Sequence, residues 1–471
     1  MIGDRVARKV TWLRESTNGR IFAAAAMIAG FSSLVKLTNL GKEILVARSF
    51  GAGDALDAFY VAFLLPGFFI GILIASCNEA FIPTYVEIRD NEGIEAAQHV
   101  FSSIAVIYVA ALVALSVALA ISQRWLLSIL ASGFGQSKLA LVRMLLFILL
   151  ASLSLSGLSA LWRAILNAHE CFALTATAPI FIPVTIAILL LFSRPAWRIY
   201  ALALGSVLGV TGEMAVNGYG LWRRGIPLLP RWYGFDWRLR QVLAQAVPAA
   251  AGAVLMGSTT LVDQAMAAML TSGSVSALNY ANKLVPLLLG IGTSSLSIVV
   301  LPAFSRLSAN RDWQGMRHIL SFYTRVILLV TLPVVAILIA FSEPLITLFF
   351  QRGAFTQENA HLVARVQSLL SLEVPFYAIS ILYVNAICAL KRNYILMWGT
   401  TIIVPENIVL NYVFMKMFGL PGIALSTSVV LMTSCYYLHS MFRRSLQQQE
   451  ASFAQRTCAI AFTVSDQLAS R

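Results

Sequence analysis

The sequence predicts an all-α membrane protein of about twelve transmembrane helices, in two six-helix lobes related by a parallel repeat around a V-shaped central cavity. Three observations lead to this prediction. Of the 471 residues, 59% are hydrophobic and 12% charged, and the mean hydropathy is +0.79, whereas soluble domains are about 45–50% apolar. Apolar runs of about 20 residues recur, each sufficient to cross a core of about 30 Å as a helix. The two halves also match at an offset of 220 residues.

Composition and motifs exclude several function classes. The net charge of +13 would suggest nucleic acid in a soluble protein, but here most Lys and Arg fall between apolar runs and set membrane orientation instead. The five cysteines have no CxxC spacing, and neither an HExxH pair nor a GxxxxGK[ST] loop occurs. We therefore expect no nucleic-acid partner, no metal site, no cofactor and no enzymatic activity.

The spans follow from the apolar runs. Residues 1–21 form a basic arm, which we do not interpret as a signal peptide because the apolar run continues through Lys36 into a segment too long and too polar for one. The predicted spans are 22–48, 57–84, 97–122, 138–163, 172–193, 198–222, 237–270, 275–303, 316–342, 358–389, 394–415 and 420–442. The segments RWLLSILASGF and SEPLITLFFQRGAF are expected to form interfacial helices after the third and ninth spans.

Charge bias between the spans predicts the orientation. If the N-terminus is inside, the cytoplasmic segments hold most of the Lys and Arg, and the opposite loops hold few. Both termini should then be cytoplasmic. The basic segments on the predicted inner side are the N-terminal arm, 223–240, 306–317, 391–392 and 443–444.

An internal repeat defines the lobes. FGAGDALDAFYVAFLLP matches LTSGSVSALNYANKLVP, which pairs Gly53 with Gly273, Tyr60 with Tyr280 and Pro66 with Pro286. A repeat with an even number of spans keeps its orientation, so two parallel lobes should flank a central cavity. We predict an N-terminal lobe at 22–225, a C-terminal lobe at 226–442 and a cytoplasmic tail at 443–471. The matched prolines would either kink two moving spans or be tolerated packing features.

Ionisable residues within the spans are the first candidate site, because each costs about 2.5–3.5 kcal/mol at the centre of a spanning helix. The candidates are Lys36, Lys42, Asp57, Glu79, Arg143, Glu213, Asp263, Lys283, Arg325, Glu373 and Glu406. Lys36, Lys42 and Lys283 could face one another across the cavity, and clustered cations there would take an anionic substrate such as a phosphate or pyrophosphate. The alternative is that these charges pair internally, for example Lys42 with Asp57.

A second candidate site is rich in oxygen. Asp263 offers a carboxylate, and Asn407 and Asn411 offer amide oxygens at i and i+4 of one span. Such ligands suit Na⁺, or Asp263 could carry a proton, so Na⁺ or H⁺ is the expected coupling ion. The alternative, in which the two asparagines only hydrogen-bond helices together, has equal weight.

Several motifs resemble the MurJ/MviN family of lipid II flippases, within the multidrug/oligosaccharidyl-lipid/polysaccharide exporter superfamily. They are VARSFGAGDALDAFYVAFLLP, EAFIPTYVEI, AILNAHECFA, SGSVSALNYANKL, VLPAFSRL and FQRGAFT, and the resemblance covers about residues 22–442. It implies a V-shaped flippase that moves undecaprenyl-pyrophosphate-linked saccharide from the cytoplasmic to the outer leaflet. It places Lys36, Lys42, Asp57 and Lys283 at family substrate positions. Asp263, Asn407 and Asn411 resemble the cation site of some members.

The resemblance implies a lipid II-like peptidoglycan precursor as substrate, moved by alternating access in the bacterial inner membrane. The alternatives are a flippase for an exopolysaccharide or O-antigen precursor, a cation-coupled exporter of the same superfamily, and a membrane scaffold. The expected partners are the lipid-linked saccharide, membrane lipids and glycan synthases. The chain departs from the family at FFIGIL (68–73), where the family has an arginine pair, and in the tail after 442, whose apolar part is too short to span.

Overall fold

The protein is described by a computed structural model of residues 17–390, 392 and 394–469, in which 17–29, 287–299 and 450–469 are described by their backbone alone. Most of the predicted basic arm 1–21, Lys391 and the last two residues of the predicted tail 443–471 therefore lie outside the described residues. Two compact units are present, one formed by Met1–Ser276 with Phe349–Asn359 and the other by Ala277–Leu348 with Ala360–Arg471.

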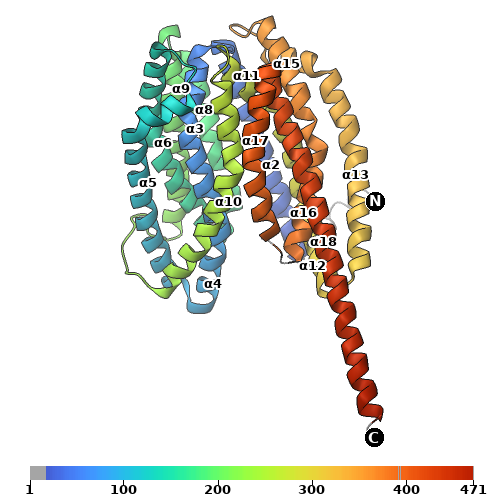
Figure 1. Cartoon of the computed structure of the whole chain (residues 1–471). Coiled ribbons are helices and arrows are strands. Elements are labelled where there is room, and N and C mark those ends of the chain that lie inside the picture. The colour runs from blue at the N-terminus through green and yellow to red at the C-terminus, as the bar shows by residue number, and fades with distance from the viewer. Residues whose placement is uncertain (1–16, 391, 393, 470–471) are drawn as a thin grey trace, which may run out of the picture. The chain divides into compact units, whose positions relative to one another are not determined.

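Helices make up both units, and the described residues contain no strand (Figure 1). The first part of the chain forms α2 (Thr17–Phe50), α3 (Asp54–Ser76), the π-turn η1 (Cys77–Phe81), α4 (Ile82–Glu92), α5 (Ile94–Leu130), α6 (Gln136–Ala168), α7 (Phe172–Thr177), α8 (Phe181–Phe192), α9 (Arg198–Arg223), α10 (Trp237–Ala267) and α11 (Ser274–Ala281), with 3-10 turns η2 (Ala178–Ile180) and η3 (Pro195–Trp197). The rest forms α12 (Leu284–Ala309), α13 (Trp313–Ala340), α14 (Ser342–Phe350), α15 (Gln357–Ser371), α16 (Glu373–Ala389), α17 (Tyr394–Phe418) and α18 (Leu420–Ala469).

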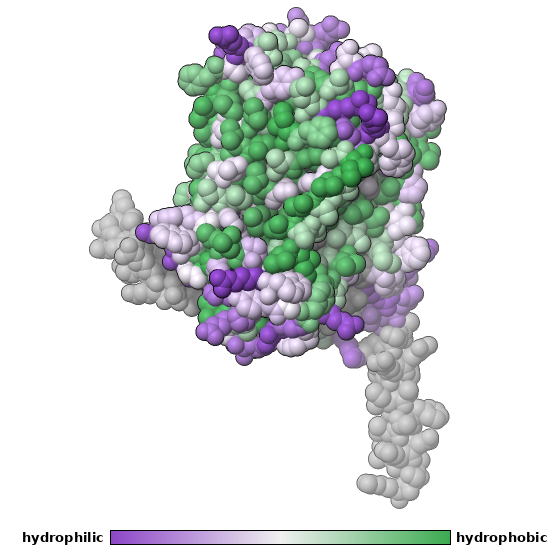
Figure 2. Space-filling model, turned by 90° about the vertical axis from the view of Figure 1, so that its left-hand side faces the viewer, coloured by the Kyte–Doolittle hydropathy of each residue, from purple (hydrophilic) through white to green (hydrophobic). Residues whose placement is uncertain are grey.

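The predicted membrane class is confirmed. Among the described residues, nine helical segments are long and apolar enough to cross a membrane, and α2, α12 and α17 add helices of 34, 26 and 25 residues. Each predicted span coincides with one helix or with consecutive helices. Figure 2 shows a broad hydrophobic band on the viewed face, with hydrophilic residues concentrated at both ends. Soluble monomers rarely expose apolar surface on this scale, so the chain is a multi-pass membrane protein.

The first unit is organised around α3 and α6. These helices pack against each other, α6 also packs against α9, and α9 against α8. Its core at one end joins η1, α4, α5 and α6 through large buried side chains, including Phe81, Tyr85, Phe101 and Leu161. These contacts hold the N-terminal ends of α3 and α6 in fixed positions, where the site described below is built.

Helix α10 belongs to the first unit by its contacts, although the repeat places the seventh span in the C-terminal lobe. It packs against α3 and η1, and a Cβ on Gly257 would lie 2.9 Å from the ring of Phe68, so the missing side chain permits this approach. The preceding linker is tied to α5, because the backbone N–H of Tyr233 donates to Ser103 Oγ at 3.2 Å. The compact units therefore differ from the predicted lobes 22–225 and 226–442, whose repeat relationship stays a prediction.

The second unit has its core between α12, α13, α16 and α18. Phe304, Leu382, Ile387 and Phe442 are buried there, and α16 packs against α12 and α18. Helix α18 runs unbroken for 50 residues (Figure 1), about 75 Å at 1.5 Å per residue and thus longer than a membrane core of about 30 Å. The predicted tail is therefore a continuation of the last span as far as Ala469.

Two repeat-based expectations were wrong in detail. RWLLSILASGF does not form a separate helix, because α5 continues through it to Leu130, whereas SEPLITLFF forms the separate α14. Pro66 lies inside α3, but Pro286 lies in the first turn of α12, where proline removes no intrahelical hydrogen bond. The eighth span is instead interrupted between α11 and α12, at residues 282–283.

Candidate functional site

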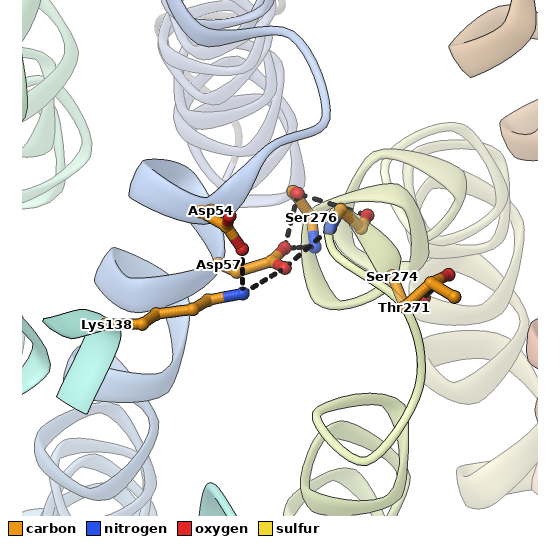
Figure 3. A network of polar contacts seen from close by, with 7 residues as sticks. Asp54, Asp57, Lys138, Thr271, Ser274 and Ser276 are labelled. Carbon is orange, nitrogen blue, oxygen red and sulfur yellow. Dashed lines mark hydrogen bonds and ion pairs between the residues drawn. The ribbon is translucent and has the colours of Figure 1, made fainter. Parts of the chain in front are cut away.

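Asp57 is the centre of a buried polar network at one end of the first unit. It lies in the first turn of α3 and is only 1% exposed. Oδ2 accepts the backbone N–H of Gly273 at 2.7 Å, and Oδ1 accepts the N–H and hydroxyl of Ser276 at 2.8 and 2.6 Å. Figure 3 shows Asp57 reaching from α3 toward the first turn of α11. The first N–H groups of a helix have no intrahelical acceptor, so Asp57 caps α11 from about 220 residues away in sequence.

Lys138 completes the network from α6. Its Nζ lies 2.9 Å from Asp57 Oδ2 and 2.6 Å from Asp54 Oδ1, and 3.8 Å from the centroid of the Phe134 ring. The Lys138 side chain is 13% exposed and that of Asp54 is 65% exposed. The ammonium and the partial positive charge of the α11 N-terminus together offset the buried carboxylate. We refer to Asp54, Asp57, Lys138, Gly273 and Ser276 as the latch.

Glycines allow the surrounding turns to pack closely. Gly273 has φ +88, and a Cβ there would lie 2.6 Å from the carbonyl oxygen of Ala52 in the α2–α3 turn. Gly51 has φ +60, and its Cβ would lie 2.3 Å from the carbonyl oxygen of Ala354. The Ala354 N–H in turn donates to Arg48 O at 2.9 Å. Only glycine combines this backbone conformation with this spacing, so the latch joins three turns that are far apart in sequence.

Asp57 was predicted to bind substrate, and the structure places it against protein donors. Four donors occupy its two oxygens, so its direct contact with substrate stays a prediction. The alternative pairing of Lys42 with Asp57 does not occur, because Lys42 Nζ lies 2.7 Å from Oε1 of its neighbour Glu43. That pair lies on α2, where Glu43 is 5% exposed.

The other predicted cations differ in their surroundings. Lys36 lies on α2 with an exposed side chain. Lys283 is half-buried and is the N-cap residue of α12, at the interruption between α11 and α12. Broken helices in transporters commonly mark substrate sites, and a helix N-terminus favours an anion. Because Lys36 and Lys42 lie in the first unit and Lys283 in the second, their predicted common cavity stays a prediction.

The residues of the predicted oxygen-rich site belong to different units. Asn411 Nδ2 donates to Asn407 Oδ1 at 3.2 Å, and both residues are buried on α17 in the second unit. Asp263 lies on α10 in the first unit. The i, i+4 amide contact is thus present, and the ion site that would include Asp263 stays a prediction. Within the described residues, no three His, Cys, Asp or Glu side chains form a metal-binding group.

Glu213, a predicted cavity charge, has a partner inside the first unit. Its Oε1 lies 3.2 Å from Arg163 Nη1 and accepts the Ser159 hydroxyl, also at 3.2 Å. Asn217 Nδ2 donates to Ser159 Oγ at 3.0 Å. This buried cluster joins α6 to α9, so its charge is neutralised between helices of one unit.

A histidine follows α6 at the opposite end of this helix from Lys138. His169 Nε2 and Tyr85 Oη are 2.9 Å apart, and Arg89 Nη1 donates to the carbonyl oxygen of Ala168 at 2.6 Å. Burial is the main cause that lowers the pKa of His169 below its ordinary value of 6.5, and Arg89 and Arg224 lower this pKa further. The neutral imidazole is therefore the form that this packing favours.

Lys138 and Ser276 are the latch residues that sequence reasoning missed. Lys138 begins the predicted fourth span, and Ser276 begins the eighth, so both lie at the same predicted membrane side as Asp54 and Asp57. That shared side was the available signal, but it selects no pair. Which charged residues meet depends on how each helix is rotated, and the apolar runs do not determine this rotation.

Comparisons with known proteins agree on one family. A family model described as "Lipid II flippase MurJ" matches residues 46–466. "Lipid II flippase MurJ" of Burkholderia cenocepacia is 28% identical over 424 residues, which cover 87% of this chain and 81% of that protein. "Probable lipid II flippase MurJ" of Buchnera aphidicola subsp. Acyrthosiphon pisum is 27% identical over 427 residues, covering 89% and 84%.

Two solved structures share the fold. "Lipid II flippase MurJ, inward closed conformation" superposes with a TM-score of 0.77 at 22% identity and covers 93% of both chains. An inward-facing multidrug resistance MATE family transporter of the MOP superfamily has the same TM-score at 13% identity, covering 91% of this chain and 99% of its own. These likenesses confirm a multi-helix membrane transporter fold.

Proposed function

The chain belongs to the lipid II flippase family MurJ, and from this premise we propose that it moves lipid II from the inner to the outer leaflet of the bacterial inner membrane. It acts as a transporter and not as an enzyme. Its substrate in this proposal is a saccharide linked through pyrophosphate to a polyprenyl chain. The observation that carries the proposal is the family match over residues 46–466, which includes the latch and Lys283.

The cationic side chains would recognise the pyrophosphate. Lys36 is exposed on α2, and Lys283 adds an ammonium at the N-terminus of α12, where the helix dipole also favours an anion. Lys42 contributes less charge because it pairs with Glu43. Lysine binds phosphate as a point charge without the bidentate geometry of arginine, so it tolerates a pyrophosphate that changes position during transport.

The latch would act as the outer gate. If the N-terminus is cytoplasmic, as the charge bias predicts, the α2–α3 turn with Asp54 and Asp57 lies on the outer side. The latch is formed in this structure. Opening to the outside would require the α11 N-terminus to separate from Asp57, in keeping with alternating access between two parallel repeats.

We propose Na⁺ or H⁺ as the coupling ion, with Asp263, Asn407 and Asn411 as its ligands. The carboxylate and the two amides supply the oxygen atoms that a hard cation prefers. Asp263→Asn removes the negative charge and keeps the size of the side chain. Transport by this variant should lose its dependence on the Na⁺ or proton gradient, and a dependence equal to that of the wild type would exclude this site.

Topology and partners follow from the same proposal. Both termini face the cytoplasm, membrane lipids surround the apolar band, and a glycan synthase uses the flipped precursor on the outer side. A reporter fused to each terminus would test the orientation. Activity of a periplasm-specific reporter at either end would contradict it.

Complementation tests the proposed function in cells. Bacteria depleted of their own lipid II flippase would express the wild type or the Lys36→Ala/Lys283→Ala double variant, and growth and surface-exposed lipid II would be scored. We expect rescue by the wild type and loss of rescue by the double variant, because the pyrophosphate would meet fewer cations. The matched control is Lys416→Ala, which removes a lysine from the exposed C-terminal end of α17.

The outcomes separate substrate from site. Failure of the membrane-inserted wild type to rescue would make lipid II the wrong substrate, and an exopolysaccharide or O-antigen precursor would be tested next. Rescue by both the wild type and the double variant would show that these two lysines do not carry recognition.

A further inference from the structure

A cavity of about 480 Å³ lies inside the second unit, lined by α13, α16 and α18. Its walls carry two polar ladders with residues four apart, which therefore share one face of each helix. The ladders are Arg317, Ser321 and Arg325 on α13, and His439, Arg443 and Gln447 on α18. The facing positions of these ladders give the cavity several donors and a strong positive charge.

The lining is cationic without a carboxylate. Three arginines contribute, and no Asp or Glu is among the lining residues. Within the described part of the chain, no carboxylate forms an ion pair with Arg325 or Arg443. Arginine stays protonated at any physiological pH, so the charge cannot be removed by titration. An anion is therefore the ligand that would balance it.

The position of Arg325 makes this charge costly unless it is used. It lies twelve residues after Trp313 at the start of α13, about 18 Å along the helix at 1.5 Å per residue. An arginine within a span costs about 2.5–3.5 kcal/mol at the centre, and such residues usually face a polar interior or a ligand. Arg325 is exposed and faces this cavity, where a bound anion would offset the cost.

The remaining lining defines the shape of the ligand. At the inner wall Tyr383 Oη lies 2.6 Å from His439 Nδ1, which holds both rings in place. Leu320, Phe442 and Leu446 supply apolar surface from the core of this unit. Polar donors beside apolar walls suit a phosphate that is attached to an apolar group, and they also accept a free phosphate.

We propose that this cavity binds a phosphate group, carried either by an anionic membrane lipid or by a soluble phosphate. The site goes beyond the proposed flipping function, because none of the lysines assigned to the translocated pyrophosphate lines it. Arg306, Arg317, Arg443 and Arg444 mark its end of the unit as the predicted cytoplasmic side, which is where an anionic leaflet or a soluble phosphate would reach it.

Lipid binding to the purified full-length chain tests the proposal. Native mass spectrometry would count phosphatidylglycerol and phosphatidylcholine bound to the wild type and to Arg325→Gln/Arg443→Gln. Loss of charge-assisted hydrogen bonds should weaken phosphatidylglycerol binding about tenfold or more. The control Arg444→Gln removes the neighbouring exposed arginine, which does not line the cavity, and should bind like the wild type.

Inorganic phosphate distinguishes the two sources. If it competes with phosphatidylglycerol for the wild type and not for the double variant, the cavity recognises phosphate itself. If phosphatidylglycerol binding depends on both arginines and phosphate does not compete, the ligand is the lipid headgroup. If the double variant does not elute like the wild type, Arg443→Gln alone replaces it. Equal phosphatidylglycerol and phosphate binding by the wild type and the arginine variants would overturn the proposal.

Discussion

Asp57→Asn should release the first turn of α11. The change removes the charge that faces Lys138 and replaces one acceptor oxygen with a donor, so at least one of the N–H groups of Gly273 and Ser276 loses its partner. Breaking a buried ion pair costs about 3–5 kcal/mol. The lower figure, about 3 kcal/mol, applies here because water partly screens Lys138, which is 13% exposed.

Hydrogen exchange measures this loss directly. The first N–H groups of α11 have no intrahelical acceptor, so the protection of Gly273 and Ser276 comes from Asp57. A loss of about 3 kcal/mol corresponds to an open population about 100-fold larger, and exchange of these amides should accelerate by that factor in a peptide covering 270–281. Mass spectrometry of the chain in detergent would record it.

The neighbouring carboxylate supplies the matched control. Asp54 pairs with the same lysine, but its side chain is 65% exposed, and within the described residues it accepts no backbone N–H of α11. Asp54→Asn should therefore change exchange at 270–281 by a small factor. Unchanged exchange in Asp57→Asn, or an equal acceleration in Asp54→Asn, would refute the reasoning that Asp57 caps α11.

Three further predictions concern the first unit. Gly273→Ala should lower the melting temperature more than Gly225→Ala, because both glycines have positive φ but only the Cβ at Gly273 meets backbone, at 2.6 Å; equal losses would contradict a close approach. The pKa of His169 is lowered, so its contribution to stability should fall as pH drops below about 6.5, and His169→Gln should flatten this dependence in a melting series, whereas an identical slope would count against it. Glu213→Gln should destabilise by about 3 kcal/mol because it leaves Arg163 without its buried counter-charge, and a melting temperature equal to the wild type's would show the pair to be dispensable.

The sequence was sufficient for the helices but not for their contacts. Apolar runs located every span, because the membrane core imposes a minimum length. The interruption at 282–283 was not predicted, because the proline-based repeat suggested a kink at Pro286 instead, and that residue lies in the first turn of α12. Likewise α10 packs with the first unit through Gly257 and Phe68, a packing detail that an internal repeat does not carry.

The candidate site shows the same division. Asp57 was identified because an ionisable residue in a span is costly, but its partners Lys138 and Ser276 are 81 and 219 positions away. Their meeting depends on helix rotation and on glycines that let turns approach. The i, i+4 contact of Asn407 with Asn411 was predictable because one helix fixes it.

Transport by the purified chain tests the central claim most directly. Reconstituted in vesicles, the wild type would be given lipid II in one arm and a polyprenyl-pyrophosphate-linked O-antigen precursor in the other, and the fraction that crosses to the opposite leaflet would be measured with a membrane-impermeant reagent. We predict lipid II transport that exceeds both the O-antigen arm and protein-free vesicles, and that falls in Lys36→Ala/Lys283→Ala. Lipid II crossing no faster than in protein-free vesicles would contradict the proposed function.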